Sequence, residues 1–413
     1  MSFTRRTTLK AIGGGAAIAA ASSIAARTAF AQGSGDILVA SIHDLSGGLD
    51  IYGKSMQDAM ILATEEINAA GGLLGRKIKL VTYDPQSNMQ LYTQFAQQAA
   101  VKDKVAVVHG GITSASREVI RPVLKRFNTL YFYNTQYEGG VCDRNTFSTG
   151  QTPAQNMEKI VPYCMKQWGK RVYIVAADYN YGQITSEWVK KYTQENGGQV
   201  VATDFFPLDV TQFGPAIQKI QAAKPDYVMS ALVGGAHISF YRQWAAAGMK
   251  ARIPMASTTF SGGNEHIVLT PQEADGIVVS FSYFPTIDTP DNKAFVERWH
   301  KRFGPEYPYI SELAVGTYQG MHLWALGVKK AGSLDRMKMI QALESGISFD
   351  GPSGKVTIDP VTHHCTLDIH IAEVKNRKMN VLAAFKQQKP ADTAAVCNLQ
   401  KNPNENKQYV IKI

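Results

Sequence analysis

The sequence predicts an α/β fold with two lobes, each built on a doubly wound parallel sheet. From Asp36 onward, short runs rich in β-branched and aromatic residues alternate with amphipathic helical stretches, which is typical of parallel sheets covered by helices. A polar stretch near residues 150–157 interrupts this alternation, which then resumes. The strands therefore form two series, and each series predicts one lobe.

The first series has four expected strands, and its first helix is clearly marked. Apolar residues of the stretch 53–72 recur on one helical face, and Gly71 and Gly72 provide a stop at its end. The strands are expected at residues 36–45, 77–84, 105–111 and 129–134.

The second series has five expected strands, and further segments follow it. The strands are expected at residues 171–179, 199–207, 226–233, 252–260 and 276–284. Helical patterns return at residues 291–304 and 311–332, and β-like segments at 355–360, 366–374 and 379–385. Periodicity alone does not fix where these last segments lie in the fold.

The first 31 residues have the pattern of a cleavable export signal. A basic start is followed by a weakly apolar Ala/Gly stretch and a small-residue end, and TRRTTLK (4–10) resembles the twin-arginine signature. The alternative, a membrane-anchoring helix, is disfavoured because residues 11–26 are too short and too glycine-rich to span a bilayer. We therefore expect a mature protein in the periplasm.

Charge and cysteine content exclude some classes of protein. The chain of 413 residues carries a net charge of +9, and removing the export segment takes four basic residues and no acid, which leaves +5. The sequence contains no run of basic residues with interleaved aromatics, so it gives no indication of nucleic-acid binding. The four cysteines, Cys142, Cys164, Cys365 and Cys397, are spaced too widely for a zinc or CxxC site. Export permits disulfides, three pairings are possible, and buried free thiols are the alternative.

Polar residues follow several of the expected strands, where open α/β sheets bind ligands. Ser114 follows the third strand at the start of a helix, so its hydroxyl and the free N–H groups there suit a carbonyl, amide or carboxylate oxygen. The alternative is that Ser114 or Ser116 caps the helix. Other candidates are Tyr52, Thr135, Tyr179, Tyr181, Gly234 and Gly235.

Signatures of enzymes are missing from the sequence. There is no GxSxG elbow, Walker loop or HExxH motif, and no GxGxxG follows a strand of the expected mature chain. His363 and His364 do not suggest a metal, because consecutive strand residues point to opposite faces. We therefore expect no catalysis, cofactor or metal.

Three segments give the sequence a specific resemblance. HGGITSASREVIRPVLKRFNTLYFYNTQYEGG (109–140), AADYNYG (176–182) and SYFPTIDTPDNKAFVERW (282–299) are similar to the urea and short-chain amide branch of the type I solute-binding proteins of ABC transporters, the family that includes the leucine/isoleucine/valine-binding proteins. The resemblance covers residues 36 to about 385. It implies two lobes joined by three crossover strands, with lobe one at residues 36–155 and 287–355 and lobe two at 156–286 and 356–413.

The resemblance also implies roles for individual residues. Ser114, Thr135 and Tyr52 of lobe one would bind the ligand first, and Tyr179, Tyr181 and the Gly234-Gly235 loop would close over it. Asn134 replaces a proline of the family pattern and favours a more polar ligand. Glu265 lies near the position of an acid that pairs with the ammonium group in amino-acid receptors, and an exposed structural glutamate is the alternative.

The resulting hypothesis is a periplasmic receptor for urea, a short-chain amide or a similar small polar nitrogen compound. It would deliver this small-molecule ligand to the permease subunits of an ABC transporter. The alternatives are a receptor for branched-chain or other amino acids and a periplasmic sensor without transport.

Overall fold

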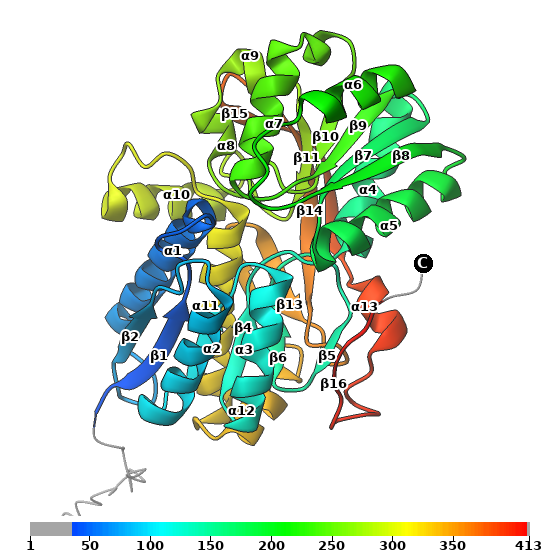
Figure 1. Ribbon diagram of the computed structural model, residues 1–413. Coiled ribbons are helices and arrows are strands. Elements are labelled where there is room, and N and C mark those ends of the chain that lie inside the picture. The colour runs from blue at the N-terminus through cyan, green and yellow to red at the C-terminus, as the bar shows by residue number, and fades with distance from the viewer. Residues whose placement is uncertain (1–34, 411–413) are drawn as a thin grey trace, which may run out of the picture. The chain divides into compact units, whose positions relative to one another are not determined.

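The computed structural model describes residues 35–410, and the expected export signal lies outside this range. Within it, two sheets of mainly parallel strands are each covered by helices, which confirms the predicted α/β class (Figure 1). We use lobe one and lobe two for the elements around the first and the second sheet. None of the helices in the described part of the chain has the length and apolar character needed to cross a membrane.

The first sheet has five parallel strands in the order β2-β1-β3-β4-β6. The strands are β1 (Ile37–Ile42), β2 (Ile78–Tyr83), β3 (Val107–Gly110), β4 (Leu130–Tyr133) and β6 (Thr146–Ser148). β1 and β3 are buried along nearly their whole length, as expected for a parallel sheet covered on both faces. The four strands predicted for this lobe are confirmed, whereas β6 was not predicted because its three residues do not lie in a longer β-rich run.

Helices cover both faces of this sheet. α1 ends where Gly72 adopts a φ of 73° and its N–H bonds to the carbonyl of Ile67 at 2.9 Å, as the glycine pair predicts. The helix α11 (Glu312–Ala331) packs against α1 and the sheet, which gives it a position that periodicity alone does not fix. The helices are α1 (Asp50–Ala69), α2 (Met89–Gln97) with a π-helical end (Gln98–Lys102), α3 (Ser114–Arg126), α10 (Pro290–Phe303), α11 (Glu312–Ala331) and α12 (Arg336–Leu343).

The second sheet contains all five strands that the second series predicts, in the order β8-β7-β9-β10-β11. They are parallel: β7 (Arg171–Ala177), β8 (Gln199–Phe206), β9 (Tyr227–Ala231), β10 (Met255–Ser257) and β11 (Val278–Phe281). The helices of this lobe are α4 (Pro153–Trp168), α5 (Asn180–Glu195), α6 (Gly214–Ala223), α7 (Gly235–Ala246), α8 (Glu265–Val268) and α9 (Pro271–Ala274).

The chain crosses between the lobes three times, as the family resemblance implies. The first crossing lies between β6 and α4, and the second follows β11. The third is β14 (Cys365–Lys375), whose start pairs with β13 (Gly354–Ile358) and whose end pairs antiparallel with β11 (Figure 1). β13 also pairs with β12 (Ser348–Gly351), and β15 (Lys378–Gln388) returns along β14. The late β-like segments therefore serve as connections and as an extension of the second sheet.

The C-terminal segment returns to lobe one. β16 (Asn406–Gln408) pairs with β5 (Val141–Asp143), and a disulfide joins Cys142 to Cys397, which precedes β16 and follows α13 (Ala391–Val396). The sequence-based boundaries had placed this segment with lobe two. Cys164 and Cys365 are buried free thiols, so one disulfide forms and two cysteines stay reduced; none of the three complete pairings is present.

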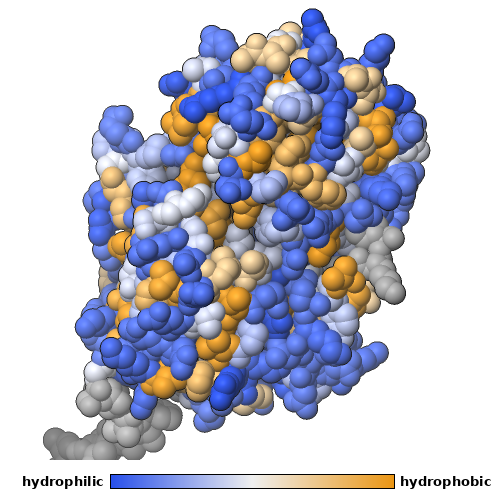
Figure 2. Space-filling model, in the orientation of Figure 1, coloured by the Kyte–Doolittle hydropathy of each residue, from blue (hydrophilic) through white to orange (hydrophobic). Residues whose placement is uncertain are grey.

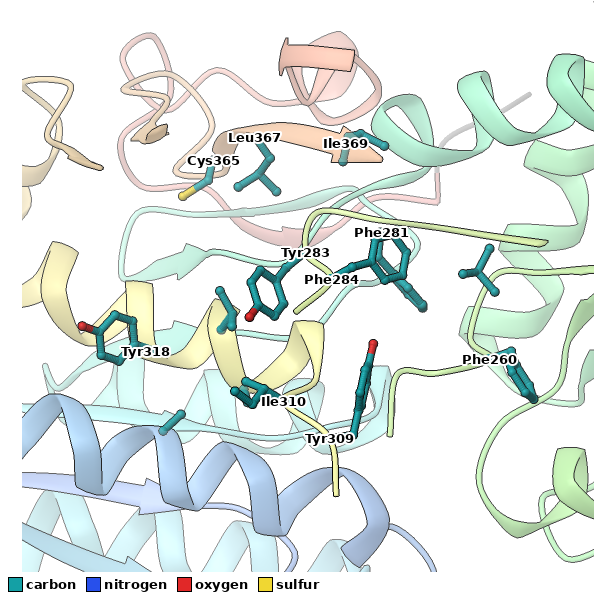
Figure 3. Packing of buried hydrophobic residues seen from close by; sticks show 14 of the residues in the cluster. Phe260, Phe281, Tyr283, Phe284, Tyr309, Ile310, Tyr318, Cys365, Leu367 and Ile369 are labelled. Atoms are coloured by element: carbon teal, nitrogen blue, oxygen red, sulfur yellow. The ribbon is translucent and has the colours of Figure 1, made fainter. Parts of the chain in front are cut away.

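Buried apolar residues continue from one lobe into the other through the crossovers. Figure 3 shows Phe281, at the end of β11, close to Tyr283 and Phe284, which follow it, near the start of α11. The rings of Phe281 and Phe284 lie 5.9 Å apart. All three side chains are fully buried, so the second crossover is anchored by aromatic packing.

Candidate functional site

A small cavity of about 40 Å³ lies between the lobes, where the carboxyl ends of strands from both sheets meet. Lobe one contributes residues that follow β1, β3 and β4, and lobe two contributes residues that follow β7, β9 and β10. This is where open α/β sheets bind ligands. None of the lining side chains is charged. The cavity is lined by Tyr52, Ile112, Thr113, Thr135, Gln136, Leu313, Tyr179, Tyr181, Val233, Thr259 and Gly262.

Tyr52 and Tyr181 occupy corresponding places in the two lobes. Each lies at the start of the helix that follows the first strand of its sheet, and each precedes a glycine. A Cβ atom on Gly53 would lie 2.0 Å from the carbonyl oxygen of Asp44, and one on Gly182 would lie 1.9 Å from that of Ala177. Only glycine permits these contacts, so the Tyr-Gly pairs bring the rings to the strand ends.

The start of α3 presents backbone donors beside the cavity. Thr113 is the N-cap and accepts from the N–H of Ser116 at 3.1 Å, while the Ser116 hydroxyl oxygen accepts from the N–H groups of Ile112 and Thr113 at 3.0 Å. The N–H groups of Ser114 and Ala115 have no partner within residues 35–410. The helix start can therefore donate to an oxygen atom of a ligand.

The Ser114 side chain turns away from this cavity. Its hydroxyl donates to the carboxylate of Glu138, which also accepts from Arg117 Nη2 at 2.8 Å. All three residues are buried, and Ser114 is not among the lining residues. Ligand binding by its hydroxyl stays a prediction, whereas Thr113 rather than Ser116 is the cap.

Thr135 and Gln136 follow β4 and line the cavity. The Thr135 hydroxyl donates to the carbonyl of Gly111 at 3.3 Å, which leaves its oxygen free to accept. The Gln136 amide donates to the carbonyl of Thr258 in lobe two at 2.8 Å, and its own carbonyl accepts from Gln151 at 3.1 Å. Gln136 therefore forms part of the cavity wall and links the two lobes.

Tyr52 forms a second link between the lobes. Its oxygen accepts from the N–H of Gly234 at 3.0 Å and lies 3.4 Å from His237 Nε2, which donates to Glu265 at 3.0 Å. Glu265 is fully buried behind this chain and does not line the cavity. Burial is the largest single influence and raises its pKa, but the hydrogen bond from His237 and the other groups around the carboxylate together lower the pKa below its usual value. Glu265 therefore already has a partner.

The remaining predicted residues line this cavity or the larger one beside it. Tyr179 lines the small cavity and also a larger one of about 660 Å³, which Gly234 and Gly235 line as well. The rings of Tyr179 and Tyr181 lie 6.1 Å apart. Tyr52, Thr135, Tyr179 and Tyr181 thus meet at one cavity, whereas Gly234 and Gly235 lie outside it.

Several lining residues were not candidates in the sequence analysis. Ile112 and Thr113 adjoin Ser114, and Gln136 adjoins Thr135, so a window of two residues around each candidate would have included them. Leu313 comes from α11, and no local pattern placed that helix beside the cavity.

His363 and His364 have separate partners. His363 Nε2 lies 3.1 Å from Glu344, and His364 Nε2 contacts the hydroxyl of Tyr137. Among residues 35–410, no group of three or more metal-ligating side chains is placed to hold an ion. The pair therefore stabilises the packing of the third crossover.

Glu312, beside the cavity residue Leu313, is a buried acid with one free oxygen. Its Oε1 accepts from Ser282 at 3.0 Å, and Oε2 has no partner among the described residues. Burial raises the pKa of Glu312 from 4.5 to about 7. The unfolded chain loses this proton first, so Glu312 reduces stability as the pH rises from about 4.5 to 7.

Glu312→Gln is expected to remove this loss. At pH 8 the variant should be about 2–3 kcal/mol more stable than the parent, and below pH 4.5 the two should unfold alike. Guanidinium unfolding across this pH range tests the prediction, with the exposed Glu306→Gln as control. If the free energies of unfolding of the parent and of Glu312→Gln changed with pH in the same way, the prediction would be contradicted.

Two lobes, each built on a parallel sheet, with a cavity between them are the arrangement of proteins that bind a small molecule between their lobes. Residues 37–393 match the family model described as a periplasmic binding protein domain, and the chain belongs to this family. A relative from Brucella melitensis, "Leu/Ile/Val-binding protein homolog 6", is 25% identical over 359 residues, which cover 85% of this chain and 90% of the relative.

Solved structures show the same fold. A solute-binding protein of an ABC transporter from R. palustris, in complex with 4-hydroxybenzoate, has a TM-score of 0.77 at 24% identity, covering 86% of this chain and 98% of that one. The branched-chain amino acid transporter substrate-binding protein LivJ from Streptococcus pneumoniae, in complex with isoleucine, has a TM-score of 0.75 at 21% identity, covering 84% and 99%. These neighbours confirm the fold, and their ligands differ from one another.

Proposed function

We propose that this protein is the periplasmic substrate-binding component of an ABC uptake transporter and captures urea, a short-chain amide or a similar small polar nitrogen compound. The cavity carries the proposal. Its volume of about 40 Å³ holds about three or four water-sized groups, which is the size of urea or acetamide. Catalysis is not part of this function.

The chemistry of the lining supports an uncharged ligand. The N–H groups at the start of α3 suit a carbonyl oxygen, and the Thr135 oxygen suits an amide N–H. Tyr179 and Tyr181 provide flat apolar walls for a planar group. With no charged side chain in the lining, an ion would lose its hydration without gaining a counter-charge.

An amino-acid ligand is the alternative, because two of the similar proteins are named for amino-acid binding. Its carboxylate would suit the start of α3, but its ammonium group needs an acid. Glu265 is occupied by His237 and by the N–H of Gly263, which lies 3.0 Å away. An amino acid would therefore require the His237–Glu265 pair to open, which disfavours this ligand.

Hinge closure is the proposed mechanism. The ligand first meets Thr135 and the start of α3 in lobe one, and lobe two then closes with Tyr179 and Tyr181. The closed form would be recognised by permease subunits of the transporter. The alternative, a sensor without transport, is tested through the partner. If the protein serves transport, the ligand and this protein together should stimulate the ATPase activity of the transporter in vesicles.

Thr135→Val is expected to weaken ligand binding about tenfold, because it removes one hydrogen-bonding group and keeps the side-chain shape. Calorimetry with the tightest-binding amide measures the effect. Thr64→Val is the matched control, since Thr64 is buried in α1 away from the cavity. Equal affinity of Thr135→Val and parent would exclude Thr135 from the site.

A thermal-shift panel of urea, formamide, acetamide, isoleucine and 4-hydroxybenzoate tests the ligand class. A ligand at 100 times its dissociation constant should stabilise the protein by about 2.7 kcal/mol. Stabilisation by isoleucine or 4-hydroxybenzoate alone would reject the amide proposal in favour of the respective acid.

A further inference from the structure

The larger cavity, here called the outer cavity, lies directly beside the small, inner one. The two share Thr113, Tyr179 and Val233 in their linings, so these residues form the boundary between them. The outer cavity has a volume of about 660 Å³ against about 40 Å³ for the inner one. A ligand in the inner cavity that carried a substituent would extend it past this boundary.

The wall of the outer cavity is mainly apolar and comes from both lobes. Leu49 and Met89 belong to lobe one, and Leu208, Val210 and Val233 to lobe two. Leu208 lies at the edge of this cavity and is 41% exposed. Figure 2 shows further hydrophobic residues at the junction of the lobes on the face that presents α3 and α5.

The polar groups of the outer cavity define which end of a ligand fits. The N–H donors at the start of α3 lie at its inner side, because Thr113 lines both cavities and Ala115 lines the outer one. Asp209 is the one charged side chain in the outer lining, and it disfavours a second carboxylate there. An uncharged apolar tail therefore suits this space.

We infer that the outer cavity is a subsite for the apolar tail of the ligand, so the substrate class is an amide with an aliphatic or aryl substituent rather than urea. The inference rests on the proposed function for the polar head, which occupies the inner cavity. Leu208, Met89 and Val233 contact the tail, and Thr113 and Tyr179 surround the bond between head and tail.

Affinity is expected to rise with chain length from acetamide through butyramide to hexanamide. Each methylene buried should improve the dissociation constant about threefold to fourfold, which corresponds to about 0.8 kcal/mol per CH₂. Calorimetry on the full mature protein measures this series. Affinity that does not change with chain length, while acetamide still binds, would overturn the inference and leave the proposed function standing.

Variants locate the effect. Leu208→Ser should reduce the gain per methylene and leave acetamide binding unchanged. Val268→Ser is the control, since Val268 is an exposed apolar residue of α8 outside both cavities. Equal chain-length dependence in Leu208→Ser and Val268→Ser would overturn the assignment.

A parallel series of acetic, butyric and hexanoic acids separates the two proposals. If affinity rises with chain length for the acids alone, and Leu208→Ser reduces this rise, the result would support the tail subsite and reject the amide head. No binding in either series would reject both. A dimer that Leu208→Ser dissociates in sedimentation experiments, without chain-length dependence, would show that a second copy covers this surface instead.

Discussion

Arg117→Ala is expected to destabilise the protein by about 3–5 kcal/mol, because it leaves the carboxylate of Glu138 buried without its cation. Both side chains have no exposed surface, and the guanidinium also lies 4.4 Å from the centre of the Tyr137 ring. Guanidinium chloride unfolding measures the loss. It is preferred to urea, which is a candidate ligand.

The exposed pair Arg302–Glu65 supplies the control. Arg302→Ala should cost at most about 1 kcal/mol, since both side chains are nearly half exposed. The double variant Arg117→Met, Glu138→Leu should be more stable than Arg117→Met alone, because no unpaired charge remains. A loss as small as that of Arg302→Ala would show that the buried pair contributes little.

Replacing both Cys142 and Cys397 by serine is expected to cost about 2–5 kcal/mol, because the disulfide closes a loop between residues 255 positions apart. The variant should also release β16 from β5. Thermal unfolding with and without reductant measures the effect. Cys164 and Cys365 should not interfere, since burial raises the pKa of both thiols well above its usual value.

Reductant should lower the midpoint of the parent to that of the double variant and leave the variant itself unchanged. A parent midpoint that reductant does not change, with the thiols shown to be free, would mean that the C-terminal segment is held by its other contacts. These include the hydrogen bond from Arg117 to Gln408 at 2.8 Å.

The strands of both series were predictable because each lies in a longer run rich in β-branched and aromatic residues; even the three-residue β10 lies within the run 252–260. β5, β6 and β16 were not, since no such run surrounds them and their pairing depends on partners elsewhere in the chain. β16 pairs with β5 across more than 260 positions, and nothing local to either segment indicates this.

The site was predictable at the level of strand ends and less so for individual atoms. The positions of Tyr52, Thr135, Tyr179 and Tyr181 after strands were enough to bring them to one cavity. The hydrogen-bond partner of the Ser114 hydroxyl could not be predicted, because this partner, Glu138, lies 24 positions further along the chain. Which of three neighbouring hydroxyl residues caps α3 also depends on a helix boundary that sequence fixes only to within one or two residues.

The two links between the lobes, Gln136 to Thr258 and Gly234 to Tyr52, are made by protein groups with one another. Together they are worth about 1–3 kcal/mol, which changes the ratio of closed to open molecules about fivefold to a hundredfold. The apparent dissociation constant equals the intrinsic one divided by the fraction in the competent state. Selection can therefore adjust the working affinity through the strength of these two links as well as through the ligand's own contacts.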